Sequence, residues 1–366
     1  MNKGYEVSDV QDIDERAIYL GCFICQWGHF LLDFVPRLWY LIDNDDPSRK
    51  LVYVSMNGQP LTGNFLEFMK VFGVNPNRLQ CITVPSRFTD IIVPETSYAR
   101  PFSYTREYAR IFEFMRSKVE ALTTTYPIYE KINWTRTKLP KARHSEIGEK
   151  DLERMFKANG YKVLAPEKLT LVQQIHHFST CKHMAGVSGT IPHNLVFSNE
   201  ETEFIILNRT YRINVNQFPI NQMSGAKVVY IDSHASFLPV SADKGPYWMV
   251  INANIKKFAE DFSFRIPSQL MKGSGRISRR EWAKYCTMYF NTYSGNELSK
   301  TDAGMAGSIM GRSRPSAENM PLHELYYYYR QQFTSICTLR TRILAWAHTM
   351  KQWLKHLIEP RKAQAI

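Results

Sequence analysis

The chain has 366 residues, of which 44% are hydrophobic and 22% charged, a composition that excludes a disordered protein. This length exceeds what one ordinary core needs and suggests two domains with an appendage. Lys and Arg number 46 against 34 Asp and Glu, which gives a net charge of +12. Such an excess favours anionic partners, namely phosphates, nucleic acids, acidic glycans or anionic lipid, or else serves solubility alone.

Cysteine usage and hydropathy indicate the cellular compartment in which the protein is expected. Six cysteines are scattered along the chain without the spacing of a disulfide framework, which fits a reducing environment. The sequence shows no charged start followed by an apolar stretch, as a secretion signal would, and no run of roughly 18 apolar residues that would span a membrane. These features predict a cytoplasmic protein, either soluble or peripheral on the inner face of the membrane.

The first part of the chain alternates short apolar runs with amphipathic segments. The runs at 51–54, 81–84 and 90–93 are typical of strands, and each precedes a turn signal or a proline. Helices are expected over 66–72, ending at Gly73, and over 105–122. This alternation predicts a mostly parallel sheet in a domain that covers residues 1–125.

A second unit begins near residue 126 and keeps the same rhythm. Helices are expected over 149–159, 169–181 and 192–197. The segments with the composition of strands are 131–135, 161–164, 184–187, 204–207 and 228–231. This βαβαβ order predicts a Rossmann-like half in a domain of residues 126–240.

The pattern changes after about residue 240, and residues 241–366 are expected to form a mostly helical region. Loops are expected at 272–276 and in the Gly-, Ser- and Met-rich stretch 304–316. The stretch 322–357 interleaves aromatic side chains with Arg and Lys on a helix. Such a helix lies at a membrane surface or packs on the protein with a solvated basic face, and the sequence leaves both readings open.

A polar stripe interrupts the apolar segment from Gly28 to Arg37. A helix that starts near Gly28 places His29 and Asp33 four residues apart on one face, and Arg37 follows after four more. This arrangement suits a general base or a group that orients an acceptor hydroxyl. The alternative is a structural network that satisfies buried polar atoms.

Cys22 and Cys25 precede His29 with the spacing of half a zinc site. The other half of such a site is missing from the sequence, and a redox pair is a second reading. Two buried neighbouring thiols are the interpretation that we adopt.

Two loops follow expected strands in the second unit, where open α/β sheets bind their ligands. The first carries Arg136 and Arg143, whose guanidinium groups suit a diphosphate, although exposed basic loops share this composition. The second spans 186–194 and offers backbone N–H groups together with the side chains of His193 and Asn194. Its alternative is an ordinary turn between a strand and a helix.

The signatures of several other enzyme classes are missing from the sequence, among them the HExxH, G-x-S-x-G, kinase and nucleotide-hydrolase patterns. The segment 43–46 has the letters of an Asp-x-Asp pair, but it precedes Pro47 and reads as a solvated turn. We therefore expect no metal and no cofactor. No recognised nucleic-acid-binding motif accompanies the basic charge, so nucleic acid is not an expected partner.

Three blocks together resemble glycosyltransferase family 61. Residues 28–38 are similar to its G-H-F-L-x-D-x-x-P-R-L element. Residues 131–138, with Arg143 and Glu146 behind them, are similar to its K-I-Y-x-S-R block, and 185–197 to its G-x-x-G-x-x-x-x-N-x-x-F block. The order and spacing of the blocks agree over about residues 20 to 235.

The resemblance implies an α/β fold of the GT-B type, in which two Rossmann-like domains face a cleft. It implies inverting, metal-independent transfer from a UDP-sugar to a glycan or lipid-linked glycan, in capsule or surface polysaccharide synthesis. On the acceptor side His29 and Asp33 become the catalytic candidates, and Arg37 supports them. The donor-binding residues that the resemblance implies are Arg136, Arg143, Ser188, Gly189, His193 and Asn194.

One departure from the family pattern concerns the strand at 204–207. The family usually ends this strand with an acidic residue, but Asn208 and Arg209 stand here. The sequence therefore does not identify the carboxylate that would bind the ribose. The alternative function is a catalytically inactive nucleotide- or glycan-binding assembly protein. The intact blocks argue against it.

Overall fold

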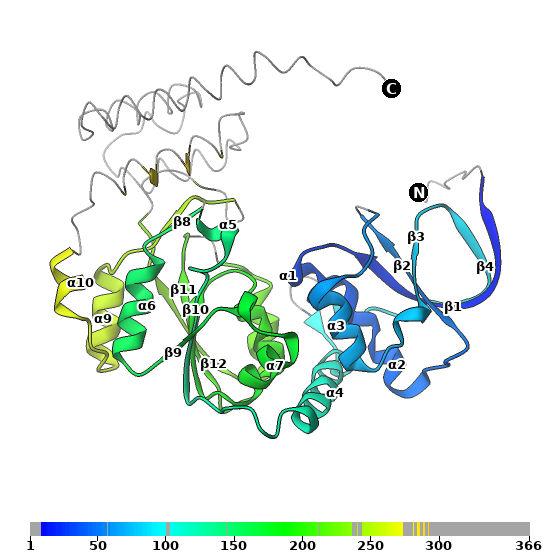
Figure 1. The fold of residues 1–366 in the computed structure, drawn as a ribbon, viewed down its shortest axis with the longest axis horizontal. Coiled ribbons are helices and arrows are strands. Elements are labelled where there is room, and N and C mark those ends of the chain that lie inside the picture. Colours follow the sequence, from blue (N-terminus) through cyan, green and yellow to red (C-terminus); the bar gives the residue numbers. More distant parts are fainter. Residues whose placement is uncertain are drawn as a thin grey trace, which may run out of the picture. The chain divides into compact units, whose positions relative to one another are not determined.

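The computed structural model describes residues 9–273, with gaps at 57, 100–102, 144, 212, 236–239 and 241–243, and residues 281, 284, 285, 288, 289 and 292. Parallel strands alternate with helices through most of this length (Figure 1). The predicted loop 304–316 and the aromatic, basic stretch 322–357 lie outside the described residues.

The chain divides into two compact units that do not follow sequence order. The first contains the described residues up to 135 together with 160–207 and 213–230, and the second contains those of 136–159, 208–212 and from 231 onward. The boundaries near residues 125 and 240 that the sequence suggests stay predictions.

A four-stranded sheet with the order β3-β2-β1-β4 forms the N-terminal part of the first unit. β1 (Gln11–Phe23) pairs in parallel with β2 (Lys50–Ser55) and β4 (Ser86–Ile92), and β2 pairs in parallel with β3 (Leu79–Ile82). The predicted parallel sheet is confirmed. In this order the chain adds strands first on one side of β1 and then on the other, so a topological switch point lies between β1 and β4.

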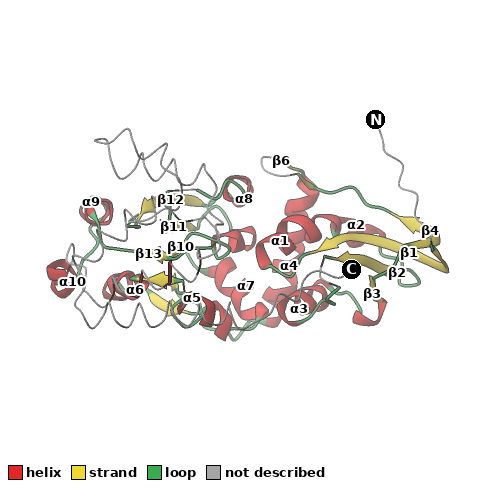
Figure 2. Cartoon of the chain, turned by 90° about the horizontal axis from the view of Figure 1, so that it is seen from above, coloured by secondary structure: helices red, strands yellow, loops and turns green. Residues whose placement is uncertain are grey.

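Helices lie beside this sheet (Figure 2). They are α2 (Trp39–Asn44), α3 (Gly63–Phe72) and α4 (Arg106–Leu122). α3 ends at Gly73, whose φ of 107° is the left-handed conformation of a C-cap, as predicted. α4 buries one face at helical spacing, with Tyr108, Ile111, Phe112, Met115 and Val119 inside.

A second sheet has the order β12-β11-β10-β7-β9. Its strands are β7 (Lys131–Trp134), β9 (Lys162–Leu164), β10 (His183–Val187), β11 (Glu203–Asn208) and β12 (Lys227–Asp232). β7 pairs in parallel with β9 and β10, and β10 pairs in parallel with β11. All five strands were predicted and are confirmed, and the switch point of this sheet lies between β7 and β10.

The connections of the second sheet carry α7 (Leu171–Thr180), the 3₁₀ helix η5 (Pro192–Phe197) and α8 (Gln217–Ser224). A short antiparallel pair, β5 (Tyr98–Ala99) and β6 (Ser103–Tyr104), precedes α4. The second unit holds α5 (Pro140–Arg143), α6 (Glu149–Ala158), α9 (Ala253–Asp261) and α10 (Ser268–Gly273), with β8 (Glu146–Ile147) parallel to β13 (Tyr247–Trp248).

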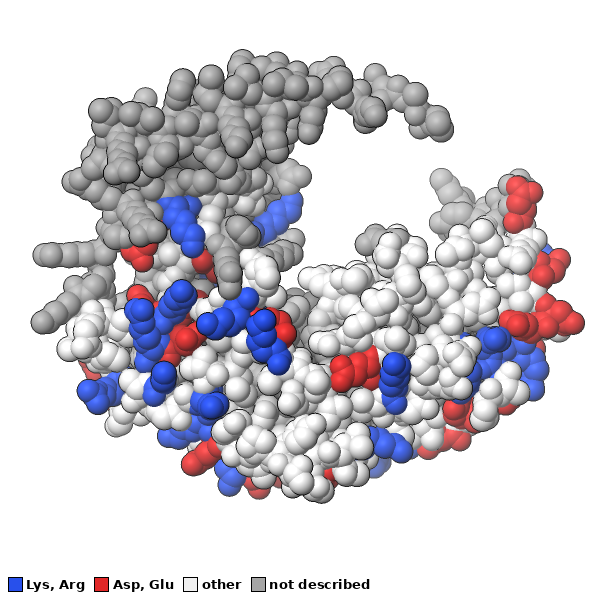
Figure 3. Space-filling view, in the orientation of Figure 1, with Lys and Arg blue, Asp and Glu red and all other residues white. Residues whose placement is uncertain are grey.

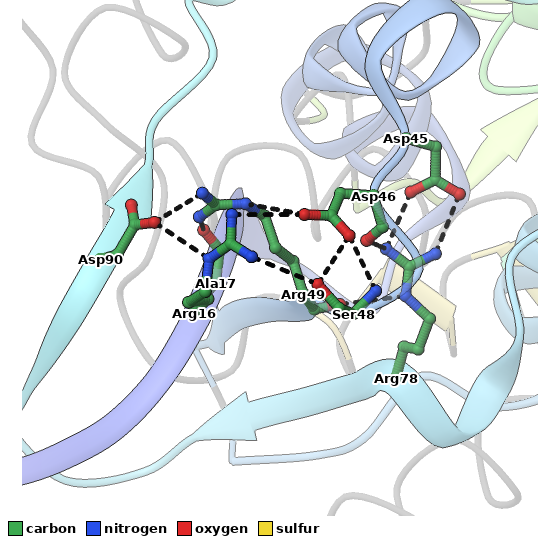
Figure 4. A network of polar contacts seen from close by, with 8 residues as sticks. All are labelled: Arg16, Ala17, Asp45, Asp46, Ser48, Arg49, Arg78 and Asp90. Atoms are coloured by element: carbon green, nitrogen blue, oxygen red, sulfur yellow. Dashed lines mark hydrogen bonds and ion pairs between the residues drawn. The ribbon is translucent and has the colours of Figure 1, made fainter.

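An ion-pair network lies where β2 begins (Figure 4). Arg49 immediately precedes β2 and bonds Asp90 of β4, while Arg78 holds Asp45 through two hydrogen bonds of 2.9 and 2.8 Å. Asp46 accepts from Ser48 and pairs with Arg49. Asp45 and Asp46 are therefore paired with arginines that directly precede β2 and β3. This is the edge of the sheet opposite to the one where parallel sheets bind ligands.

Candidate functional site

Residues 27–44 form one helical path whose hydrogen-bond pattern changes along its length. It runs as α1 (Trp27–His29), the π-helical η1 (Phe30–Phe34), the 3₁₀ helix η2 (Val35–Arg37) and then α2. Pro36 explains the change, because it lacks an N–H and its ring excludes the carbonyl four residues earlier. Single π-helical turns of this kind are frequent at functional sites.

The carbonyl groups of this irregular stretch find partners elsewhere. The Tyr108 hydroxyl of α4 donates to the Leu31 carbonyl at 3.0 Å. Ser97 donates its N–H and its hydroxyl to the Pro36 carbonyl at 3.0 and 2.6 Å. These contacts fix the distorted helix, and they therefore fix the side chains that it carries.

His29 and Asp33 lie in contact on this helix, as their spacing predicts. Nδ1 of His29 lies 2.8 Å from Oδ2 of Asp33, with the two side chains 34% and 28% exposed. An ionised carboxylate accepts a hydrogen bond, so it selects the tautomer that carries the proton on Nδ1 and leaves Nε2 as the basic nitrogen. The pair has the geometry of an oriented base, and its catalytic role stays a prediction.

Arg37, four residues after Asp33, lies beside β1. Its Cζ lies 5.9 Å from the ring centroid of Tyr19, and a Cβ placed on Gly21 would lie 3.0 Å from its Nη1. That Arg37 shares a face with His29 and Asp33 stays a prediction.

The loop that follows β10 lies at the switch point of the second sheet. The Ser188 N–H donates to the Leu207 carbonyl at 2.8 Å, and Gly189 has a φ of 137°. His193 and Asn194 are only 3% and 5% exposed. Nδ1 of His193 lies 2.7 Å from Oε1 of Gln217, so its imidazole is held inside the unit.

This loop touches the start of the helix that follows β1. The Trp27 indole N–H donates to Oδ1 of Asn194 at 2.8 Å. A Cβ placed on Gly28 would lie 3.1 Å from both Cδ2 of His193 and Cγ2 of Thr190, so the two segments approach as closely as glycine permits. The segments that leave the two switch points therefore meet inside the first unit.

These contacts bear on the donor residues that the resemblance implies. His193 and Asn194 are engaged in holding the loop against the helix, and Ser188 uses its N–H within the sheet. Gly189 alone lies at a left-handed φ in this loop, where the missing side chain lets a ligand approach the backbone. Donor binding by these residues stays a prediction.

Arg136 belongs to a buried charge cluster in the second unit. Its Nε donates to Glu146 at 2.9 Å, and its backbone N–H donates to Glu149 at 2.6 Å. Nη1 of Arg209 lies 2.8 Å from the same Glu146 oxygen, and the Arg209 guanidinium lies 4.2 Å from the ring centroid of Tyr247. Glu146 has a side chain only 3% exposed and thus sits between two guanidinium groups.

Arg209 is a site candidate that the sequence did not single out. It stands at the end of β11, at the departure from the family pattern, and that position was the available signal. Beside it the Asn208 amide donates to Asp232 at 2.9 Å, so a carboxylate from the end of β12 lies next to the position where the family carries its own. The backbone of Arg143 lies in α5, and its side chain lies outside the described residues.

A pocket of about 550 Å³ opens beside this cluster. Figure 3 shows Lys and Arg side chains gathered on the part of the molecule that carries α5 and α6. The pocket contains both signs of charge, and its lining residues are Thr137, Lys138, Ala142, Glu146, Ile147, Gly148, Glu149, Lys150, Asp151, Arg154, Glu281 and Lys284.

The cysteine pair does not match its expected burial. Cys22 is partly exposed and Cys25 is exposed, both as free thiols, so burial is wrong for Cys25. Within the part of the chain that the structure describes, no three His, Cys, Asp or Glu side chains are grouped to hold a metal ion. The same described residues contain no helix with the length and apolar character to cross a membrane.

Comparison with known proteins identifies part of the chain. A family model described as Glycosyltransferase 61 matches residues 27–205, which contain the His29–Asp33 pair, Arg136 and the loop after β10. This match confirms the predicted resemblance and supports a glycosyltransferase. No curated protein sequence matches the chain.

Among solved structures, a glycosyl transferase of family 9 from Veillonella parvula DSM 2008 is similar at 12% identity. The alignment covers 71% of this chain and 92% of that one, with a TM-score of 0.28. A score this low does not relate the two folds.

Proposed function

Because residues 27–205 match a family model described as Glycosyltransferase 61, we propose that this enzyme moves a sugar from a UDP-linked donor to a glycan acceptor, with inversion and without a metal ion. The acceptor is a glycan or a lipid-linked glycan of a capsule or other surface polysaccharide. We propose a GT-B arrangement, with the two parallel sheets as its Rossmann-like halves. The observation that carries the proposal is the contact of Gly28 with Thr190 and His193, next to the His29–Asp33 pair.

His29 is the base in the proposed mechanism. The acceptor hydroxyl attacks the anomeric carbon from the face opposite UDP, and its proton passes to Nε2 of His29. The new glycosidic bond forms as the bond from the anomeric carbon to the diphosphate oxygen breaks, and the electron pair leaves with UDP. Asp33 holds the imidazole in the required tautomer and stabilises the imidazolium that forms.

Arg136 and the loop after β10 are assigned to the donor. Glu146 fixes the Arg136 side chain through Nε, while its two Nη groups make no hydrogen bond among the described residues. Guanidinium groups oriented in this way suit the charge that develops on a leaving diphosphate. The resemblance also implies a donor-binding role for the backbone of Gly189, with Ser188, His193 and Asn194 holding its loop, and for Arg143 as a further cation.

The location proposed for the enzyme is the cytoplasm, with contact to the inner face of the membrane through residues 322–357. Basic and aromatic side chains in this stretch suit an anionic surface that carries a lipid-linked acceptor. Vesicle flotation of the full chain, with and without anionic lipid, tests this part of the proposal.

The test of function is release of UDP from a panel of UDP-sugars in the presence of a bacterial glycan extract. We expect release with at least one donor, and its loss by about 100-fold or more in Arg136→Ala. UDP binding in calorimetry with no turnover for any donor would support the inactive assembly protein instead. Turnover at the wild-type rate in Arg136→Ala would remove Arg136 from the site.

A further inference from the structure

We propose that Arg37 forms an anion-binding site at the carboxyl end of β1, and that this site takes the phosphate or carboxylate group of an acidic acceptor. The anion site stands on the geometry of the first unit alone. Its assignment to the acceptor rests on the proposed function.

Among the residues that the structure describes, the Arg37 guanidinium has no counter-charge. It makes neither a hydrogen bond nor an ion pair with any of them, and its Nε is buried from solvent. The carboxylate four residues earlier, Asp33, is bonded to His29 instead. A buried guanidinium nitrogen such as this Nε is normally paired, because an unpaired one loses its hydration without replacement.

The backbone of β1 is shaped to receive this guanidinium. The register between β1 and β2 shifts between Tyr19 and Gly21, and Gly21 has a φ of 105°. A Cβ on Gly21 would lie 3.0 Å from Nη1 and 3.7 Å from Cζ of Arg37. A bulge at a glycine therefore makes the room that the side chain occupies.

Tyr19 does not supply the missing negative charge. Its ring centroid lies 5.9 Å from Cζ of Arg37, at the outer limit of a cation–π contact. Burial raises the pKa of the Tyr19 phenol, with Arg37 acting in the opposite direction, so the phenol is neutral at physiological pH. The net charge at this point is thus that of Arg37.

The place of the site indicates its ligand. Gly21 lies two residues before the end of β1, beside the switch point where open parallel sheets bind ligands. The helix that carries Arg37 also carries His29 and Asp33. The planar guanidinium accepts a phosphate or a carboxylate through paired hydrogen bonds. An acceptor with its hydroxyl at His29 would therefore present its acidic group to Arg37.

Calorimetric titration of the full chain, saturated with UDP to occupy the donor site, tests the proposal. The probes are glucose 6-phosphate, glucuronate and neutral glucose, and the proteins are wild type, Arg37→Met and Arg110→Met. Arg110 is the matched control, because it pairs with Asp43 on the surface at 2.8 Å. We expect wild type and Arg110→Met to bind at least one acidic sugar more tightly than glucose, and Arg37→Met to lose this preference.

The choice of sugars distinguishes a phosphate group from a carboxylate as the anion that Arg37 binds. Preference for glucose 6-phosphate indicates a phosphorylated acceptor, and preference for glucuronate a uronic acid. Equal binding by Arg37→Met and wild type, or no preference for either acidic sugar in wild type, would overturn the site. Binding that appears only without UDP would assign the anion to the donor and overturn the acceptor assignment.

Thermal unfolding without ligand distinguishes an arginine that binds a ligand from one that stabilises the fold. Met keeps the apolar stem of the side chain and removes an unpaired charge, so Arg37→Met should melt at or above the wild-type temperature. A clearly lower midpoint would indicate a structural role. Should Arg37→Met not fold, Arg37→Lys keeps the charge but loses the paired geometry, and we expect it to bind the acidic sugar about tenfold more weakly.

UDP release by the wild-type protein is measured separately. A chain that binds acidic sugars through Arg37 and releases no UDP keeps the anion site and loses the proposed transferase activity. A chain that releases UDP without binding acidic sugars keeps the proposed transferase activity and loses the anion site.

Discussion

Asp33 lies on the same side of the helix as His29 because a spacing of four residues almost completes a turn. That relation is local, and so the sequence alone predicts the 2.8 Å contact. The contact gives the carboxylate a defined task, since it determines which imidazole nitrogen carries the proton. Removing its charge should then affect catalysis without affecting donor binding.

We expect Asp33→Asn to lower kcat by about 100-fold or more, because an amide neither fixes the tautomer nor stabilises the imidazolium. The KM for the donor should stay within about twofold of wild type, because only the chemical step is affected. Initial rates of UDP release measure both quantities. Asp43→Asn, which disturbs only a surface pair with Arg110, is the control, and an equal loss there would show a general effect of charge.

Glu146 illustrates a relation that the sequence hides. It bonds Arg136 across 10 positions and Arg209 across 63, and neither spacing follows from helical or strand periodicity. Only folding brings β8 next to the end of β11. The sequence therefore indicated Arg136 and passed over Arg209.

Glu146→Gln should destabilise the protein by about 3 to 5 kcal/mol, because it leaves two poorly exposed guanidinium groups without their carboxylate. The free energy of unfolding in urea measures the change. Asp12→Asn removes the partner of Arg87 on the surface, where both side chains are more than two-thirds exposed, and should cost less than about 1 kcal/mol. A cost for Glu146→Gln no larger than this control would show that the cluster contributes little.

Within the four- and five-stranded sheets, β1 is the strand that sequence patterning missed. Its first half carries Asp12, Asp14, Glu15 and Arg16, so no apolar alternation marks it as a strand. The structure places this half beside β4, where Arg16 pairs with Asp90 and Arg87 with Asp12. Ion pairs between strands replace apolar contacts there, and only the second half of β1 is buried.

Sequence periodicity did not predict the π-helical turn either. The sequence indicated a helix from Gly28, and Pro36 as an irregular point within it, but not how the surrounding turns adjust. The partners that accommodate the change, Tyr108 and Ser97, come from segments more than 60 positions away. The helix was predicted, whereas its winding was not.

Gly148 connects β8 to α6 under a steric constraint that can be tested. It has a φ of 87°, and a Cβ there would lie 1.8 Å from the Met249 carbonyl oxygen. We expect Gly148→Ala to cost about 2 to 4 kcal/mol in free energy of unfolding, from backbone strain together with displacement of Met249, which directly follows β13. Gly160→Ala shares the strain, with a φ of 82°, but meets nothing within 4 Å, so it should cost only about 1 kcal/mol. Equal costs would show that the clash relaxes freely.

Among the residues that the structure describes, two buried imidazoles contribute to the response to acid. Burial, together with the neighbouring His176, lowers the pKa of His177 to about 4, and burial also lowers the pKa of His234. An unfolded histidine titrates near about 6.5, so the unfolded chain binds more protons between these values. The stabilisation is complete above about pH 6.5 and is lost as the pH falls towards 4.

His177→Phe should remove roughly 2 to 3 kcal/mol of the stability lost between pH 7 and pH 4.5, because the aromatic packing remains while the titrating group is gone. Urea unfolding at the two pH values measures the difference. His183→Gln is the control, since His183 is partly exposed and paired with Glu203. An unchanged pH response in His177→Phe would show that other groups dominate.

At the scale of the whole molecule, the sequence predicted two parallel sheets and the segments that leave their switch points. It did not predict that the Trp27 and Asn194 side chains join those segments, since 167 positions separate them. We propose that this junction is the active site, with His29 as its base. The decisive experiment measures UDP release by His29→Gln, using the donor and glycan extract that support the highest wild-type rate. We expect a rate at or below about 1% of wild type with UDP affinity retained, whereas release at the wild-type rate would exclude His29 as the base.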